Sequence, residues 1–309
     1  MEKPFRTAEE QVDILESRGL KITDREDAVR TLLSWSYYTL VNGYKDMFLD
    51  PTKSREAHDD RYIEGAYFEQ LKLAYALDRG LRSATIDVLM KAESVMKTSL
   101  VHAFCQKYGG GDSYLEEGWE CGVNFYRGRK EDYVSNLSRL KDTLKKVRRN
   151  SRHKDYIQHY IDDYGNVPLW VLAPCLNFGD IAMFFDFQGD VVQNLACANV
   201  AKASGKDQIS PRKMREAYQI MTPFRNICAH NERVFCAKVG PRGQYRMKDL
   251  FYALGIVLSD KDVSRYAWSV RYYIDVVKNE GFLNKVLAGM NMSYAEIDKL
   301  ASSNEDAQS

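Results

Sequence analysis

Three side chains near residue 225 have the types and spacing that phosphodiester chemistry needs. In the stretch MTPFRNICAHNERVF, Arg225 and Asn226 come just ahead of His230, one of five histidines in the chain. A guanidinium can bind two phosphate oxygens and stabilise their charge in a transition state. An imidazole can act as general base on an RNA 2′-hydroxyl or as general acid toward the leaving oxygen, because it exchanges a proton near neutral pH. Asn226 could orient the phosphate or the imidazole. The alternative is a polar interruption in a core helix.

The residues before Arg225 predict the start of a helix. Thr222 suits an N-cap and Pro223 suits the first helical position. Arg225 would then lie in the first turn, where unpaired amides and the helix dipole favour an anion. On an ideal helix the step from Arg225 to His230 is a rotation of about 140°, so the two side chains do not share a face. Two such helices meeting across a dimer would close that gap.

Composition limits the class of protein. The chain has 309 residues, 45% of them hydrophobic, and a net charge of +1, so any nucleic-acid contact has to come from a local patch. The N-terminus MEKPFRTAEEQ has no signal-peptide pattern, and no window reaches about 18 uninterrupted apolar residues. The six cysteines show no CxxC and read as reduced core thiols. We expect a cytoplasmic protein that does not span a membrane, without a metal site built on Cys228, His230 and Cys236.

A local basic patch is present at residues 139–154, RLKDTLKKVRRNSRHK, where eight Lys or Arg stand against one Asp. If Leu140, Leu144 and Val147 turn inward on a helix, the remaining positions form a basic face. The RNA-backbone contacts predicted on it are Lys145, Lys146, Arg148, Arg149 and Arg152. The alternative is an ordinary solvated helix face.

Helical patterns run through most of the chain. The apolar spacing from Tyr67 to about Gln106 predicts one long helix, or two broken near Gly80, and Asp78 and Arg82 are spaced for an ion pair on it. Capping signals are present at Thr7, Ser210 and Ser293. Further helices are expected over about 131–149 and 154–163, behind Pro168 with Trp170 as a core anchor, and over 247–258 and 262–279.

These elements predict an all-α protein in three parts. An N-terminal helical unit covers residues 1–66, and its last segment, 50–66, is polar without a period and is predicted to be a loop. A helical bundle covers 67–245 and contains the arginine and histidine. A C-terminal helical extension covers 246–309 and ends in a frayed tail.

Several separated stretches resemble the bacterial Abi (abortive infection) family, of the AbiD/AbiF kind. They occur in the family's order from about residue 3 to residue 236. The stretches are KPFRTAEEQVDILESRGLKI, LLSWSYYTLVNGYKDMF, YFEQLKLAYALDRGLRSATIDVLMKAE, VPLWVLAPCLNFGDIAMFF and FRNICAHNERVF.

That family is placed in the HEPN superfamily of α-helical bundles, whose motif is an Arg, often followed by Asn, and then His after four to six residues. Arg225, Asn226 and His230 match it with four residues between Arg and His. The resemblance implies a metal-independent endoribonuclease without a cofactor, in which two copies of the motif meet in a homodimer. Family members often carry a glutamate where this chain has Ala173 or Pro174, and Glu93 is the nearest candidate for a helper carboxylate.

Three functions follow for testing. The leading one is a toxin-like endoribonuclease of phage defence with a HEPN-type bundle, catalytic Arg225, Asn226 and His230, and RNA as substrate. The second is a non-catalytic protein that holds a structured RNA through the same motif and the basic helix. The third is a dimeric protein-interaction module that controls a partner and has no role with nucleic acid.

Overall fold

A computed structural model describes residues 4–124, 126, 128–150 and 154–303, and over these residues the all-α prediction is confirmed. Backbone pairing outside helices is limited there to isolated bridges such as Lys21 with Tyr67 and Leu49 with Tyr62. The HEPN-type arrangement and the boundaries at residues 66 and 245 stay predictions.

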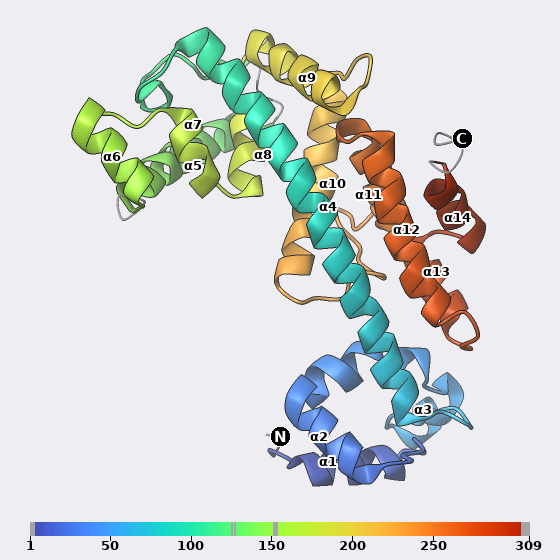
Figure 1. The fold of residues 1–309 in the computed structure, drawn as a ribbon. Helices are drawn as coiled ribbons and strands as arrows, with labels where there is room; N and C mark the ends of the chain where they lie inside the picture. Colours follow the sequence, from blue (N-terminus) through green and yellow to red (C-terminus); the bar gives the residue numbers. More distant parts are fainter. Residues whose placement is uncertain (1–3, 125, 127, 151–153, 304–309) are drawn as a thin grey trace.

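The longest element is α4 (Phe68–Tyr108), a single helix of 41 residues, about 60 Å long at 1.5 Å per residue. It runs through the length of the molecule, from the N-terminal helices to the far end (Figure 1). Gly80 does not break it. A Cβ at Gly80 would lie 2.3 Å from the ring of Tyr273, so the glycine lets an aromatic side chain pack directly on the backbone of α4.

The N-terminal unit surrounds the beginning of α4 (Figure 1). The expected cap at Thr7 is present and forms a capping box with Glu10. Asp24 caps the next helix by accepting from the amide of Asp27. The prediction of a loop over 50–66 is wrong in part, because Asp50 caps a short helix that begins at Pro51. The helices of this unit are α1 (Ala8–Ser17), α2 (Arg25–Trp35) and α3 (Pro51–Ala57).

Four short or medium helices gather at the other end of α4 (Figure 1). They are α5 (Lys130–Asn150), α6 (Asp155–Tyr164), α7 (Leu169–Leu172) and α8 (Phe178–Asp186). The turn Ala173–Cys175 links α7 to α8. Trp119, Phe104 and Phe184 pack together as the aromatic centre of this end. Trp170 is not a core anchor, because 48% of its surface is exposed.

The remaining helices pack along α4 and one another, as Figure 1 shows. Ser210 and Ser293 cap their helices as expected. The helices are α9 (Asp190–Ser204), α10 (Pro211–Ala229), α11 (Met247–Val257), α12 (Asp260–Val276), α13 (Leu283–Met290) and α14 (Tyr294–Ser302). Among the described residues, no helix is both long and apolar enough to cross a membrane.

Candidate functional site

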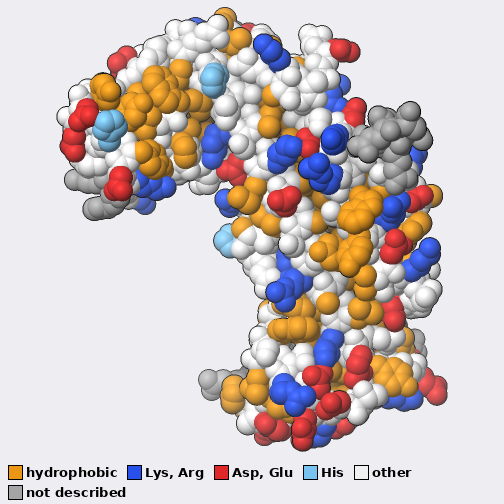
Figure 2. All heavy atoms as spheres, in the orientation of Figure 1, with side chains coloured by type: hydrophobic (Ala, Val, Ile, Leu, Met, Phe, Trp, Pro, Cys, Tyr) orange, Lys and Arg blue, Asp and Glu red, His pale blue; other side chains and the backbone are white. Residues whose placement is uncertain are grey.

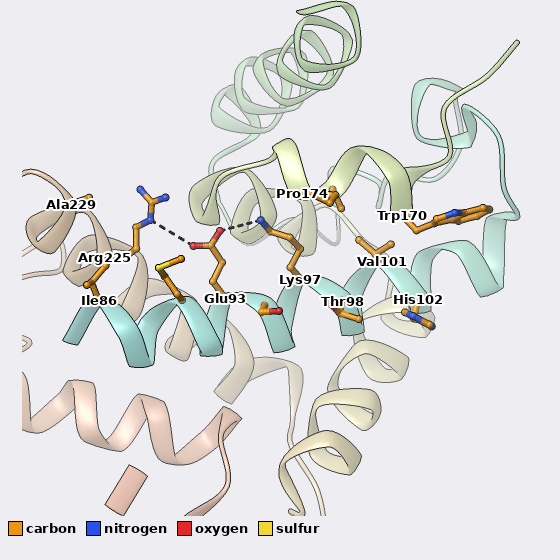
Figure 3. Close-up of a pocket in the computed structure, with 13 residues that line it drawn as sticks. Ile86, Glu93, Lys97, Thr98, Val101, His102, Trp170, Pro174, Arg225 and Ala229 are labelled. Carbon is orange, nitrogen blue, oxygen red and sulfur yellow. Dashed lines mark hydrogen bonds and ion pairs between the residues drawn. The ribbon is translucent and has the colours of Figure 1, made fainter. Parts of the chain in front are cut away.

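A groove of about 710 Å³ runs along α4 and is bounded by α7, the Ala173–Cys175 turn and the end of α10. Its lining includes Arg225 together with Glu93 and Lys97 of α4 (Figure 3). Figure 2 shows the surface hollowed where the α5–α8 end meets the rest of the molecule. The arginine of the sequence motif therefore faces an open site.

Glu93 lies between two cations in this groove. Its Oε1 accepts from Nζ of Lys97 at 3.1 Å, and its Oε2 is 3.6 Å from Nε of Arg225, an ion pair slightly longer than a hydrogen bond. The Glu93 side chain is 13% exposed and that of Arg225 is 31% exposed. In Figure 3 the two terminal nitrogens of Arg225 point away from Glu93. The two nitrogens that can bind phosphate therefore lie away from this carboxylate.

Lys97 has a second partner, because its Nζ also donates to the carbonyl of Leu176 at 2.6 Å. An ammonium group has three donors, so one remains for a ligand. Glu93 is a predicted candidate carboxylate, whereas Lys97 is not among the predicted site residues. The signal was present, since a Glu and a Lys four residues apart on one helix form a pair.

The predicted helix start at Thr222 and Pro223 is wrong. Helix α10 begins at Pro211 behind the N-cap Ser210 and continues through Pro223 to Ala229. The hydroxyl of Thr222 is buried and makes no hydrogen bond among the described residues. Burial of Met221 and Phe224 keeps the chain helical here, although a proline inside a helix leaves the preceding turn short of one hydrogen bond.

Arg225 accordingly lies one turn before the end of α10, not in its first turn. The C-terminal end of a helix carries partial negative charge, so the dipole there favours cations and opposes a bound anion. An anion bound at this position would depend on the side chains of Arg225 and Lys97, without help from the dipole.

His230 is the C-cap of α10 and its side chain is exposed. Asn231 follows with φ of 59°, in the left-handed region that asparagine tolerates better than most residues. The amide of Glu232 then donates to the carbonyl of Ile227 at 3.0 Å, and that of Asn231 to Cys228 at 3.4 Å. This pair of bonds is the Schellman motif, and it fixes the backbone that carries the histidine.

A buried carboxylate anchors the chain just beyond His230. Asp78 of α4 is fully buried and accepts from the amides of Val234 and Phe235, each at 3.0 Å. It also accepts from the hydroxyl of Tyr44 at 2.9 Å and pairs with Arg82 at 2.5 Å. The expected Asp78–Arg82 pair is thus confirmed, and it lies in the core.

Only part of the motif lines the groove. Arg225 and Ala229 line the groove, whereas His230 is absent from its 13 lining residues. Asn226 is exposed. The residue after the histidine, Asn231, lines a second hollow of about 460 Å³ beside the N-terminal unit. His230 therefore lies at the helix end between two hollows.

The helix predicted over about 131–149 is confirmed, because α5 spans Lys130–Asn150. Leu140 and Leu144 are buried, as expected. The cations of α5 differ in their surroundings. Lys145 and Lys146 are exposed. Arg148 donates to both carboxylate oxygens of Asp112, at 2.9 and 2.8 Å, and is committed to that pair. Arg149 is exposed, and Arg152 lies outside the described residues.

The cysteines contribute no metal-binding cluster to the part of the chain that is described. No group of three or more His, Cys, Asp or Glu side chains there could hold a metal ion. Cys228 and Cys236 are half-buried free thiols. Burial, with the nearby carboxylate of Asp78, raises the pKa of Cys228 to about 12, which keeps the thiol protonated at neutral pH.

Comparison with known proteins gives one match. Residues 30–236 match the family described as Abi-like protein, and this segment is more than half of the chain. No curated protein matches, and no solved structure matches either. The matched segment contains α4 and α10, so it includes the groove with Glu93 and Arg225 as well as His230. The chain therefore belongs to the Abi-like protein family, which links it to abortive infection as a defence against phage.

Proposed function

We propose that this protein is a metal-independent endoribonuclease of the HEPN kind that acts as a toxin-like effector of abortive infection. The observation that carries the proposal is Arg225, which Glu93 holds at Nε in an open groove while the terminal nitrogens point away from that carboxylate (Figure 3). The Arg225, Asn226 and His230 spacing and the resemblance to the AbiD/AbiF kind support the same assignment.

The reaction follows from these groups. His230 removes the proton of a 2′-hydroxyl, whose oxygen attacks the adjacent phosphorus, or it donates a proton to the departing 5′-oxygen. The new P–O2′ bond forms as the P–O5′ bond breaks, which yields a 2′,3′-cyclic phosphate and a 5′-hydroxyl. Arg225 stabilises the charge that develops on the non-bridging oxygens, and Asn226 orients the phosphate.

A homodimer completes the site in this proposal. Arg225 lines the groove and His230 does not, and a step of five residues on a helix is a rotation of about 140°, which favours a site built from two chains. The end of α10 is exposed at Asn226, Ala229 and His230. Two such ends brought together would set the histidine of one chain against the arginine of the other.

The direct test is an RNA-cleavage assay in EDTA with wild type, Arg225→Ala and His230→Ala. We expect wild type to produce 2′,3′-cyclic phosphate ends and both variants to lose at least about a hundredfold in rate. An inactive wild type, or a His230→Ala protein that cuts as fast as wild type, removes the nuclease assignment. Sedimentation of the same samples measures the dimer.

A second function is supported by a different observation, the exposed Lys145 and Lys146 on α5. A protein that only holds a structured RNA needs these cations and Arg225 but no proton transfer. It would bind RNA without cutting it, and His230→Ala would leave its affinity within about twofold of wild type.

A further inference from the structure

Trp170 lies in the same groove as Arg225, at the opposite end (Figure 3). It comes from α7, and 48% of its surface is exposed. About half of this large aromatic side chain is thus open to a ligand in a groove that also contains cations. Figure 2 shows that hydrophobic side chains gather over α6 and α7 at this end of the molecule.

The indole lies against the backbone of Gly110, just beyond the end of α4. A Cβ at Gly110 would lie 2.9 Å from Cη2 of Trp170, so the ring lies against a backbone that has no side chain to displace it. Part of the ring is therefore covered by this backbone, while about half of the side-chain surface stays open. An aromatic side chain fixed in this way is already oriented for stacking, with little conformational entropy left to lose.

The floor between Arg225 and Trp170 is one face of α4. From Glu93 to His102 the helix rises about 14 Å at 1.5 Å per residue, which is longer than a single nucleotide. Lys97, Thr98 and Val101 lie along this face (Figure 3). From Arg225 the groove thus offers the cation Lys97, then Thr98 and Val101, and an aromatic ring at the far end.

We propose that this groove binds single-stranded RNA, with one base stacked on Trp170 and the neighbouring phosphates on Lys97 and Arg225. Stacking and backbone contact together are the usual means of holding single strands without reading their sequence. Paired bases in a duplex are already stacked and cannot offer a face to Trp170. The inference rests on the proposed function in assuming RNA as ligand, and it adds a strand preference and a base-binding residue.

The test measures binding with a strand that cannot be cut. A fluorescent 2′-O-methyl oligonucleotide lacks the 2′-hydroxyl nucleophile, and its Kd is measured by anisotropy as a single strand and as a duplex. The variants are Trp170→Ala, Trp170→Phe and the control Trp268→Ala, which removes another half-exposed tryptophan from α12. We expect Trp170→Ala to raise the single-strand Kd about tenfold. Trp170→Phe should keep most of the wild-type affinity, and Trp268→Ala should leave the Kd unchanged.

Tryptophan fluorescence gives a second readout that does not depend on a loss of affinity. The single strand should quench the wild-type emission, and Trp170→Phe should bind while losing that quenching. Equal single-strand Kd values for Trp170→Ala and Trp268→Ala overturn the inference, and so does a duplex that binds as tightly as the single strand. If wild type binds through Trp170 but cuts no RNA, the nuclease assignment fails and the binding site stands.

Discussion

The carboxylate of Glu93 lies 3.6 Å from Nε of Arg225 and shares its other oxygen with Lys97. The two residues come from helices α4 and α10, which are more than a hundred residues apart in the chain. We predict that Glu93→Gln lowers RNA cleavage about tenfold, because an amide holds the guanidinium less firmly in its catalytic orientation. Single-turnover rates measure the effect. Asp87→Asn, an exposed carboxylate on the same helix, is the control and should cut at the wild-type rate.

Asp78 should be among the most sensitive residues for stability. Asp78→Asn leaves Arg82 buried without its counter-charge and weakens the hold on the Val234 and Phe235 amides. Loss of one partner of a buried ion pair costs about 3–5 kcal/mol, and urea unfolding measures it. The neighbouring Arg79 is exposed, and Arg79→Gln should stay within about 0.5 kcal/mol of wild type. Equal midpoints for the two variants would contradict the buried network.

The two prolines of α10 should respond differently to alanine. Pro211 occupies the first turn, where its missing N–H is no loss, so Pro211→Ala should change stability by about 0.5 kcal/mol or less. Pro223 lies inside the helix. Pro223→Ala restores a hydrogen bond to the preceding turn and should stabilise the fold by roughly 1–3 kcal/mol. A destabilised Pro223→Ala would mean that packing of the proline ring outweighs the missing hydrogen bond.

Cys228 should resist alkylation in the native protein. The thiolate is the reactive form, and with a pKa of about 12 a thiol is ionised to about one part in three thousand at pH 8.5. Reactivity should therefore rise about tenfold per pH unit and stay far below that of an ordinary cysteine. Iodoacetamide labelling followed by peptide mass spectrometry measures it, and unfolding the protein should abolish the protection. Rapid native labelling at pH 8.5 would contradict the raised pKa of this thiol.

The basic helix should show two classes of residue. Lys145→Gln and Lys146→Gln should each reduce the slope of log K against log salt for RNA by about one without changing stability. Arg148→Gln removes both bonds to Asp112 and should lower the unfolding midpoint as well. Titration of RNA at several salt concentrations, beside thermal melts, separates the classes. An unchanged salt slope in the Lys145 and Lys146 variants would mean that α5 has only a solvated face.

Local signals in the sequence predicted the starts of three helices. Thr7, Ser210 and Ser293 cap their helices because a hydroxyl at this position satisfies an amide that the helix leaves unpaired. The same kind of signal failed where packing decided the outcome. Thr222 and Pro223 resemble a helix start, yet the buried Met221 and Phe224 carry α10 straight through them. At residues 50–66 the apolar pattern is too weak to indicate a helix, although Asp50 and Pro51 form its N-cap and first residue.

The site was predictable in residue type and less so in arrangement. Arg225 and His230 stand out by type and spacing, and Glu93 was named as a candidate carboxylate. The pairing of Glu93 with Arg225 depends on how α10 crosses α4, and no local pattern encodes that crossing. The exposure of Trp170 also could not be predicted from a local pattern. An apolar run such as VPLWVL has the same composition whether a given residue faces the core or a groove.

Because α4 is one unbroken helix, the number of residues between two of its side chains fixes their relative direction around the helix axis. Asp78, which anchors the chain after His230, and Glu93, which holds Arg225, are fifteen residues apart on one rigid rod. Inserting or deleting a single residue between them would turn one anchor by about 100° against the other. Substitutions on the outer face of this interval can be absorbed, but a change in its length cannot. We therefore expect active relatives to keep the number of residues between these two carboxylates, even where the residues in this interval differ.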